Sequence, residues 1–313
     1  MASEFEIIKK LRAVFPKIGD DAVEFKVSNI PIVSTDAFVM GEHFGDYFTP
    51  YDMGYKALSA SISDIAACGG IPKYVLVSMG LSSGEMDFIN ELYRGMQEVA
   101  NLYKVEIIGG DTTKSSTLFI SVTVIGETKR FIGRNGARVG DAICVTGELG
   151  SSAAGLLALK NGLVGNRYIC SLHLNPKPRV KEGIKIGKYA SSMIDISDGL
   201  IIDLSHLLEE SCVGAEIWKN KIPISKETIK IANKFSLSAQ DFAMSGGEDF
   251  ELLFTIPKDK LKEAQKKVDF TEIGEIIEPR TENRKPRIID EEGNDIPVAG
   301  FDHFNRSPLL SKE

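Results

Sequence analysis

Five short acidic motifs are the residues of this chain whose types and spacing are best suited to chemistry. They are Gly19-Asp20-Asp21, Ser34-Thr35-Asp36, Ser63-Asp64, Gly109-Gly110-Asp111 and Asp195-Ile196-Ser197-Asp198-Gly199. Most of them fall where a strand is expected to end, and a single Asp there is usually a turn or cap residue. Several that converge in space would instead offer hard oxygen ligands for Mg²⁺, which proteins commonly share with substrate phosphates. The set therefore predicts metal-assisted chemistry on a phosphorylated substrate.

The motif Asp195-Ile196-Ser197-Asp198-Gly199 is the most specific of these signals in the second half of the chain. It joins a predicted buried strand to a predicted helix. Asp195 and Asp198 are three residues apart across the turn, so both carboxylates can face one ion. Ser197 could cap the helix, whose N-terminus favours anions. The alternative is an ordinary capped turn.

Two standard nucleotide-binding signatures are absent from the sequence. Neither G-x-x-x-x-G-K-[ST] nor G-x-G-x-x-G after a strand occurs, so an ATP site would need another geometry. The Gly109-Gly110 pair lets the backbone approach a ligand closely, Asp111 adds a carboxylate, and Lys114 can reach a phosphate. A tight hairpin would use the same residues and is the alternative.

Three further positions carry candidate polar groups. Asp64 lies on a predicted helix face without Lys or Arg, which hints at a nearby cation; a solvated face is the alternative. Glu248, in the glycine-flanked turn 245–251, could accept hydrogen bonds from an amine or hydroxyl of a substrate, unless the turn is merely solvated. Arg134 lies in a glycine-rich linker, where its planar guanidinium could bind phosphate or simply be a solvated charge.

Hydrophobic periodicity predicts the elements that must position these groups in the first half. We expect helices over residues 4–14, 52–68 and 84–103, and strands over residues 30–36, 73–79, 105–108 and 117–125. After the first helix the order is β-α-β-α-β-β. This order predicts an α+β fold in which a mixed sheet carries its helices on one face.

The second half predicts a separate α/β domain. We expect strands over residues 142–146, 191–195 and 251–256, helices over residues 151–159, 179–189 and 199–210, and a tail of short strands and turns from residue 270. A chain of 313 residues is long for one core, so two domains are expected. The glycine-rich, basic segment 131–141 is the best candidate for the boundary, which predicts domains at residues 1–138 and 139–313.

Charge and residue usage exclude several classes of protein. The net charge of −7 disfavours a non-specific nucleic-acid binder, which would need a basic face. The cysteines form no C-x-x-C pair and the histidines no H-x-x-x-H arrangement, which argues against zinc and for scattered thiols in a reducing cytosol. The N-terminus has no apolar signal core, and no stretch reaches the roughly 20 apolar residues of a membrane helix. We therefore expect a soluble cytoplasmic protein without nucleic-acid or membrane partners.

In their joint order and with their neighbours, the motifs resemble those of thiamine-monophosphate kinases. That family belongs to a wider group with aminoimidazole ribonucleotide synthetase, selenophosphate synthetase and the hydrogenase maturation dehydratase. The matching stretches run from residue 19 to residue 304; they are the five acidic motifs with Gly41-Glu42-His43-Phe44, Gly133-Arg134-Asn135-Gly136-Ala137, Ser245-Gly246-Gly247-Glu248-Asp249-Phe250-Glu251 and Phe301-Asp302-His303-Phe304. The Asp195–Leu200 and Ser245–Asp249 motifs together select the kinase over its relatives. One position departs, because Asn175 stands where the family often has Arg.

The resemblance implies transfer of the γ-phosphoryl group of ATP to thiamine monophosphate, with several Mg²⁺ ions bridging the phosphates. The implied metal ligands are Asp21, Ser34, Thr35, Asp36, Asp64, Asp111, Asp195 and Asp198. The implied ATP contacts are Gly110, Asp111, Arg134, Ser197 and Tyr93. The residues expected to be catalytic are Asp111, Arg134 and Asp198.

The resemblance also implies how the second substrate and a second chain are bound. Thiamine monophosphate would contact His43, Glu248 and Phe301, the last by stacking on a ring of the vitamin. Two chains would form a homodimer by joining their N-terminal sheets, with the active site in a cleft between the domains.

Phosphoryl transfer of this kind agrees with the shortage of histidines and of nucleophile–base pairs in the sequence. Phosphoryl transfer depends mainly on positioning and on neutralising oxygen charge, and an acceptor that is already a phosphate anion needs no strong base. The shortage of histidines and of nucleophile–base pairs is therefore expected for direct in-line transfer without a phospho-enzyme.

Two alternatives remain at this point. One is an enzyme similar to aminoimidazole ribonucleotide synthetase, which activates an amide oxygen as a phosphate; the other is a non-catalytic nucleotide-binding regulator. Selenophosphate synthetase is disfavoured because the first cysteine, Cys68, lies in a predicted helix and not in a glycine-rich N-terminal loop.

Overall fold

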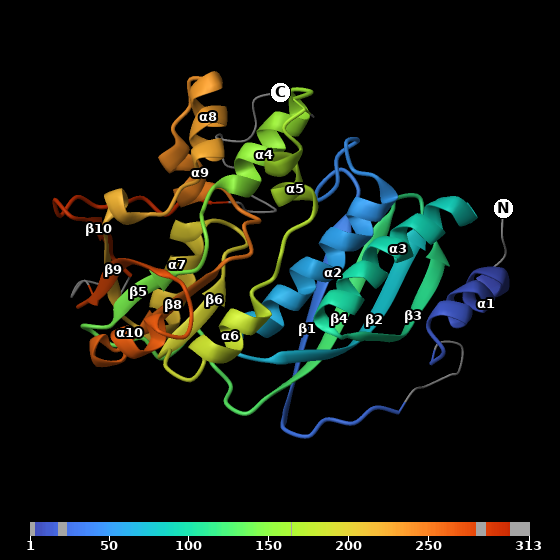
Figure 1. Cartoon of the computed structure of the whole chain (residues 1–313), viewed down its shortest axis with the longest axis horizontal. Helices are drawn as coiled ribbons and strands as arrows, with labels where there is room; N and C mark the ends of the chain where they lie inside the picture. The colour runs from blue at the N-terminus through green and yellow to red at the C-terminus, as the bar shows by residue number, and fades with distance from the viewer. Residues whose placement is uncertain (1–3, 18–23, 164, 280–285, 301–313) are drawn as a thin grey trace. The chain divides into compact units, whose positions relative to one another are not determined.

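The protein is described here by a computed structural model, in residues 4–17, 24–163, 165–279 and 286–300. The chain forms two compact units, one made of residues 1–65 and 70–129 and the other of residues 66–69 and 130–313. The first unit thus gives way to the second at Lys129–Arg130, whereas the predicted boundary is at residue 138. The expected two-domain organisation is confirmed (Figure 1).

The first unit is built on a four-stranded mixed sheet in the order β1-β4-β2-β3. Its strands are β1 (Ile30–Val39), β2 (Ile71–Leu81), β3 (Glu106–Lys114) and β4 (Phe119–Thr128). β4 pairs antiparallel with β1 and β2, while β2 pairs parallel with β3. The helices of this unit are α1 (Glu4–Val14), α2 (Pro50–Ala67) and α3 (Met86–Tyr103). The predicted mixed α+β sheet is confirmed.

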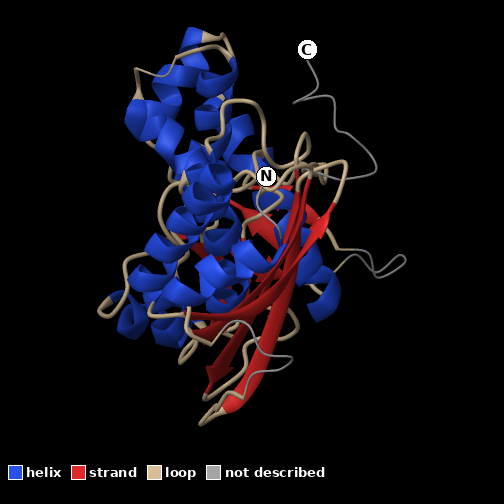
Figure 2. Ribbon diagram, turned by 90° about the vertical axis from the view of Figure 1, so that its right-hand side faces the viewer, coloured by secondary structure: helices blue, strands red, loops and turns tan. Residues whose placement is uncertain are grey.

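Helices α2 and α3 lie against one face of this sheet (Figure 1), and Figure 2 shows the long strands from another side with most of the helices to their left. α3 buries Ile89, Leu92 and Met96 at helical spacing, which is why this stretch forms an amphipathic helix on the sheet. The two helices approach so closely that a Cβ atom on Gly95 would lie 2.0 Å from the carbonyl oxygen of Tyr51. Glycine is therefore required where the helices cross.

Two strands are longer than predicted, so two acidic motifs lie inside strands and not at their ends. β1 continues to Val39, and Asp36 pairs with Val122 of β4. β3 continues to Lys114, and Asp111 pairs with Ser78 of β2. Asp is a poor strand former, but pairing with an established neighbouring strand outweighs that local preference.

The second unit contains a six-stranded sheet in the order β10-β7-β9-β5-β8-β6. The strands are β5 (Ala142–Val145), β6 (Ser192–Asp195), β7 (Gly214–Ile217), β8 (Leu252–Ile256), β9 (Thr271–Ile277) and β10 (Ile288–Asp290). Apart from the parallel β10–β7 pair, neighbouring strands are antiparallel. This sheet is therefore of the α+β kind, and not the parallel sheet of a doubly wound α/β domain.

The helices of the second unit are α4 (Ser151–Lys160), α5 (Arg167–Leu174), α6 (Val180–Ile186), α7 (Leu200–Ser211), α8 (Lys226–Lys234), α9 (Ala239–Ser245) and α10 (Lys258–Gln265), with the 3-10 turn Lys219–Lys221. The predicted helices correspond to α4, α6 and α7, whereas α5, α8, α9 and α10 were not predicted. These helices are short, and a few apolar residues over two turns give little periodicity to read.

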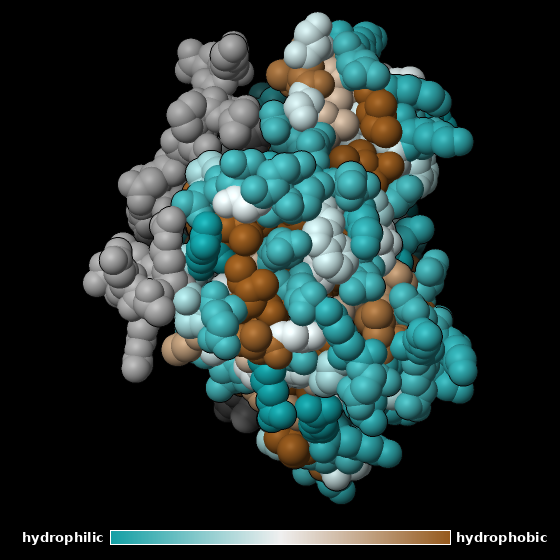
Figure 3. Space-filling model, turned by 90° about the vertical axis from the view of Figure 1, so that its left-hand side faces the viewer, coloured by the Kyte–Doolittle hydropathy of each residue, from teal (hydrophilic) through white to brown (hydrophobic). Residues whose placement is uncertain are grey.

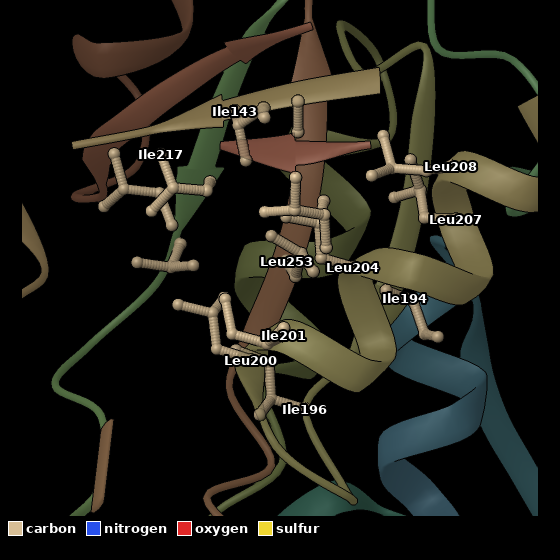
Figure 4. Packing of buried hydrophobic residues seen from close by; sticks show 14 of the residues in the cluster. Ile143, Ile194, Ile196, Leu200, Ile201, Leu204, Leu207, Leu208, Ile217 and Leu253 are labelled. Atoms are coloured by element: carbon tan, nitrogen blue, oxygen red, sulfur yellow. The ribbon is translucent and has the colours of Figure 1, made fainter. Parts of the chain in front are cut away.

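A contiguous hydrophobic cluster holds α7 against the second sheet (Figure 4). Leu200, Leu204 and Leu207 of α7 belong to the same cluster as Ile143 of β5 and Leu253 of β8. Every residue of β5 and β8 is buried, as expected for central strands. The chain segment just before α7 is therefore attached to a rigid base.

The outer surface of the molecule on the side shown in Figure 3 is mostly hydrophilic, and the apolar groups on it are separated by polar ones. None of the helices in the described part of the chain combines the length and apolar character of a membrane span.

Candidate functional site

Two carboxylates and a hydroxyl meet in the first unit. Ser34 and Asp36 are two residues apart on β1, so their side chains point to the same face of the sheet. That face is the one on which Ile32 and Phe38 are buried. The Ser34 hydroxyl donates a hydrogen bond to the carboxylate of Asp64, which reaches the strand from α2. Three predicted metal ligands from two distant segments are thus brought together.

The electrostatics of this group favour a cation. Burial, followed by the nearby charge of Asp64, raises the pKa of Asp36 to about 6, while a hydrogen bond from Ser61 opposes the shift. Two adjacent carboxylates disfavour each other's ionised form, and a cation between them would remove that penalty. The donors are all hard oxygens, the ligand type that Mg²⁺ prefers, so the residues present fit this ion.

The Asp36–Asp64 pair is not a complete metal cage. Among the described residues, no three His, Cys, Asp or Glu side chains lie together so as to hold a metal ion. Mg²⁺ usually takes one or two carboxylates and completes its shell with water and substrate phosphates, so a pair with an adjacent hydroxyl is sufficient. Asp21, another expected ligand, lies outside the described residues.

The side chain of Thr35 points to the opposite face of the sheet from Asp36. Its hydroxyl lies 2.9 Å from the hydroxyl of Thr123, its partner across β4. The Thr35 hydroxyl therefore cannot join Asp36 and Asp64 at one ion without a change in strand register. Its part as a metal ligand stays a prediction that would depend on the main-chain carbonyl.

Gly110 and Asp111 lie on the far edge of the sheet from Asp36. Gly110 is in register with Val77, Val77 with Val122, and Val122 with Asp36. Three strand spacings separate β1 from β3, which is about 14 Å. Within this unit, Asp111 and the Asp36–Asp64 pair cannot share one ion.

Gly110 has a clear structural reason to be glycine. A Cβ atom there would lie 1.8 Å from the carbonyl oxygen of Val77. The exposed Asp111 accepts a hydrogen bond of 2.9 Å from the backbone N–H of Thr112. The ATP contacts of these two residues stay predictions.

His43 and Tyr93 occupy different surroundings in the first unit. His43 lies in the turn after β1, where its Nδ1 atom accepts a hydrogen bond of 3.1 Å from the N–H of Val39. Its ring meets Phe38 edge-on, with 5.5 Å between centroids. Tyr93 is buried in α3 beside Phe15, and burial raises the pKa of its hydroxyl. Their substrate and ATP contacts stay predictions.

The second unit places the turn 195–199 between β6 and α7, as the sequence predicts. Asp195 is the last residue of β6 and is buried. The helix begins without a side-chain cap at its N-cap residue, Gly199. The expectation that Ser197 caps the helix is therefore wrong.

Asp203, in the first turn of α7, binds the stretch of chain that leads into the helix. One oxygen of its carboxylate, Oδ2, accepts hydrogen bonds from the N–H groups of Ser197, Asp198 and Gly199, at 3.0, 3.0 and 3.1 Å. Burial and then the charge of Asp198 raise the pKa of Asp203 to about 7, against the effect of these hydrogen bonds. Asp203 was not among the predicted site residues, although an Asp among the apolar residues of a buried helix is a visible signal in the sequence.

The turns 195–199 and 245–251, predicted as separate motifs, lie side by side. The N–H of Glu248 donates to the carbonyl of Ser197 at 2.7 Å, and the N–H of Phe250 donates to the carbonyl of Ile196 at 2.9 Å. A Cβ atom on Gly247 would lie 2.4 Å from the Ser197 carbonyl oxygen, so glycine is needed for this approach. The contact between the turns thereby brings Asp198, a predicted metal ligand, and Ser197, a predicted ATP contact, next to Glu248, a predicted contact to thiamine monophosphate.

The acidic residues of the turn 245–251 have different partners. Asp249 accepts hydrogen bonds from the N–H groups of Gly150 and Ser152, at 2.7 and 2.9 Å, and so closes the start of α4. The buried Glu251 binds the guanidinium of Arg179 and accepts a 2.6 Å hydrogen bond from the hydroxyl of Thr146. These two acids are structural.

Glu248 differs from its neighbours because its carboxylate faces a histidine. Its Oε2 atom lies 3.4 Å from Nδ1 of His173, a buried residue of α5 that also lies 3.0 Å from the hydroxyl of Ser152. Glu248 itself adopts a left-handed backbone conformation, with φ of 63°. The sequence analysis missed His173, since nothing in its local sequence relates it to a turn more than 70 residues away.

Arg134 lies in the segment that runs along the edge strand β6. The N–H of Met193 donates to the carbonyl of Gly133 at 3.1 Å, two residues before Asp195. The Ser211 hydroxyl donates to the carbonyl of Arg134 at 3.0 Å, which anchors the backbone. The exposed Arg134 side chain is thus carried beside the strand that ends in Asp195.

Phe301 lies outside the described residues. The last described residue, Gly300, is packed so that an added Cβ atom would lie 2.8 Å from the carbonyl oxygen of Asp198. The stacking contact of Phe301 stays a prediction.

Comparisons with known proteins agree with the motifs. Two family models match: AIR synthase related protein, N-terminal domain, over residues 19–128, and AIR synthase related protein, C-terminal domain, over residues 138–285. A thiamine-monophosphate kinase of Aquifex aeolicus is 37% identical over 310 residues, covering 96% of this chain and 98% of that protein. One of Buchnera aphidicola subsp. Acyrthosiphon pisum is 40% identical over 330 residues, covering 97% and 99%.

A similar fold is known from solved structures. The structure of AaThiL complexed with AMPPCP and TMP superposes with a TM-score of 0.80 at 35% sequence identity, covering 96% of this chain and 97% of that one.

The raised pKa of Asp249 predicts a pH-dependent contribution to stability. Burial raises this pKa to about 7, from about 4 in the unfolded chain. The folded state therefore binds the proton more tightly, so the contribution is complete below pH about 4 and is lost as the pH rises through about 7. The free energy of unfolding of the wild type, minus that of Asp249→Asn, should fall across this window in urea titrations. A difference that stays constant with pH would contradict the assignment.

Proposed function

Because the chain belongs to the thiamine-monophosphate kinase family, we propose that it transfers the γ-phosphoryl group of ATP to thiamine monophosphate. The products are ADP and thiamine diphosphate. The observation that carries the proposal is the pairing of the turns 195–199 and 245–251, since it joins Ser197 and Asp198 to Glu248. The related structure with AMPPCP, an ATP analogue, and TMP supports the same pair of ligands.

The reaction uses residues that bind and orient two anions. Arg134 offers a planar guanidinium to phosphate oxygens, and Ser197 offers a hydroxyl at the start of α7. Glu248 and His43 orient the acceptor, whose phosphate is already anionic and requires no base to remove a proton. The acceleration then comes from holding the two phosphates in line. We propose that the reaction takes place in the cytoplasm, where ATP is available.

Magnesium is the metal that these residues suit. Asp36, Asp64 and Ser34 would hold it in the first unit, and Asp195 and Asp198 would hold it in the second. When bound, the ions neutralise charge on the phosphate oxygens. Asp111 is proposed as a further ligand. The number of ions follows from how many of these carboxylates each ion takes.

A homodimer is proposed from the face of the first sheet opposite α2 and α3, on which the β1 side of the sheet is exposed. Val33 pairs with Ile125, which pairs with Tyr74, so these three side chains form one row on the face opposite α2 and α3. Val33 is 69% exposed. A second copy of this face would cover the row by two-fold symmetry, as isologous dimers do.

The first experiment is a turnover assay. Magnesium-dependent formation of ADP from ATP should require thiamine monophosphate, and chromatography should find one thiamine diphosphate for each ADP. Asp198→Asn removes one carboxylate charge with little change in volume and should abolish turnover. Turnover only with an amide-bearing nucleotide would instead indicate a synthetase, and silence with both acceptors would indicate a binding protein.

If Asp36 binds Mg²⁺, its replacement should not destabilise the metal-free protein but should abolish the stabilisation by Mg²⁺. Without metal, Asp36→Asn should be at least as stable as the wild type, because it removes like-charge repulsion from a half-buried pair. Mg²⁺ should raise the melting temperature of the wild type but not of this variant. Asp46→Asn, an exposed residue beyond β1, is the control and should keep the wild-type response. An equal response to Mg²⁺ in the wild type and Asp36→Asn would refute the assignment.

The homodimer predicts the outcome of sedimentation velocity experiments. The wild type should sediment with twice the mass of one chain, and Val33→Asp should sediment as a monomer, because each interface would bury two new carboxylates. Leu102→Asp, which changes a side chain that is 59% exposed on α3, is the matched control and should leave the dimer intact. A monomeric wild type would exclude the proposal.

A further inference from the structure

We propose that Asp203 is a positioning residue, which sets the geometry of Ser197 and Asp198 and through them the affinity for the metal–nucleotide complex. The inference rests on the proposed function, since that function assigns Ser197 to ATP and Asp198 to a metal. The observation behind it is that three consecutive N–H groups of the turn converge on one oxygen of Asp203.

The carboxylate of Asp203 has no direct route to a substrate. The residue is 2% exposed, and its Oδ2 atom lies 3.0 to 3.1 Å from the three N–H donors. The backbone of Asp203 is itself held by α7, where its N–H donates to the carbonyl of Gly199 at 3.0 Å. Asp203 must therefore act through the turn and not on the reacting atoms.

Three N–H donors on one acceptor determine the turn more strictly than a helix cap does. A typical cap residue satisfies one or two donors, whereas here three consecutive N–H groups of the stretch 197–199 are oriented by one carboxyl oxygen. Because the N–H groups of Ser197 and Asp198 are directed to Asp203, the orientation of the backbone that carries these two side chains is set by that contact. Without the acceptor, the buried N–H of Gly199 and the partly buried N–H groups of Ser197 and Asp198 would need other partners, and the turn would change shape.

The position of the turn is passed on to the acceptor side of the site. The carbonyl of Ser197 accepts the N–H of Glu248 at 2.7 Å, and Gly247 packs against the same carbonyl. A shift of Ser197 would therefore move Glu248 as well. This linkage distinguishes Asp203 from Asp249, which closes the start of α4 and has no contact with 197–199 among the hydrogen bonds of the described residues.

The chain offers a matched control in Asp290. This residue is also buried, and its Oδ1 atom accepts N–H groups of a turn, those of Glu292 and Asn294 at 3.2 and 2.8 Å. The turn 292–294 carries none of the proposed ligands. Asp203→Asn and Asp290→Asn thus replace a carboxyl acceptor by an amide in two buried turns, of which only one supports the proposed site; Asp290 differs in also pairing with Lys219 at 2.8 Å.

The test measures binding of Mg²⁺–AMPPCP by titration calorimetry and thermal unfolding of the ligand-free proteins. Asp203→Asn should weaken Mg²⁺–AMPPCP binding at least about tenfold, the loss typical of groups that orient metal ligands, while the free protein still unfolds cooperatively. Asp290→Asn should lower the melting temperature but leave the affinity within about twofold. If Asp203→Asn does not fold, Asp203→Glu, which keeps the charge but displaces the carboxylate, should show the same loss of affinity.

Three outcomes would overturn the proposal. They are wild-type affinity in a folded Asp203→Asn or Asp203→Glu variant, an equal loss of affinity in Asp290→Asn, and absence of Mg²⁺–AMPPCP binding by the wild type. Failure of the proposed function is separable, because it would appear as a wild type that binds Mg²⁺–AMPPCP normally and does not phosphorylate thiamine monophosphate.

Discussion

Repulsion between carboxylates that must lie close together is the constraint on which the candidate site depends. Asp64 raises the pKa of Asp36 in the first unit, and Asp198 raises that of Asp203 in the second, in each case added to the effect of burial. Like charges hold such positions only if other groups supply hydrogen bonds to them. In the first unit a hydroxyl, that of Ser34, supplies one, and in the second the backbone does. Binding of a cation, together with a phosphate that shares it, would stabilise such a site by reducing the repulsion between its carboxylates.

The second unit meets this constraint by building its site from backbone as much as from side chains. The carbonyls of Ile196 and Ser197 are used to bind the turn 245–251, and the N–H groups of 197–199 are used to bind Asp203. Few polar groups of this segment are then left to fluctuate, so its side chains are presented in fixed directions. The apolar cluster that packs α7 on β5 and β8 is what keeps this arrangement in place.

Closely spaced acidic residues of one motif can have unrelated tasks. Asp249 binds N–H groups at the start of α4 and Glu251 binds Arg179, while the carboxylate of Glu248 faces His173. A count of acidic residues in this motif therefore overstates its ligands. The same distinction separates Ser34 from Thr35, since adjacent residues of a strand point to opposite faces of the sheet.

The sequence by itself determined the family-defining motifs, the two-domain organisation, the mixed first sheet and the longer helices. Those features depend on local residue types and on periodicity along one segment, as in the Ile89–Met96 stripe of α3. Only the tertiary structure decided that Asp36 lies within β1 next to Asp64, that Asp111 lies about three strands away, and that Asp203 binds the turn 197–199 while His173 lies beside Glu248. These outcomes depend on register and on contacts between distant segments. Local sequence does not specify such contacts, because pairing and burial in the assembled fold outweigh the preferences of single residues.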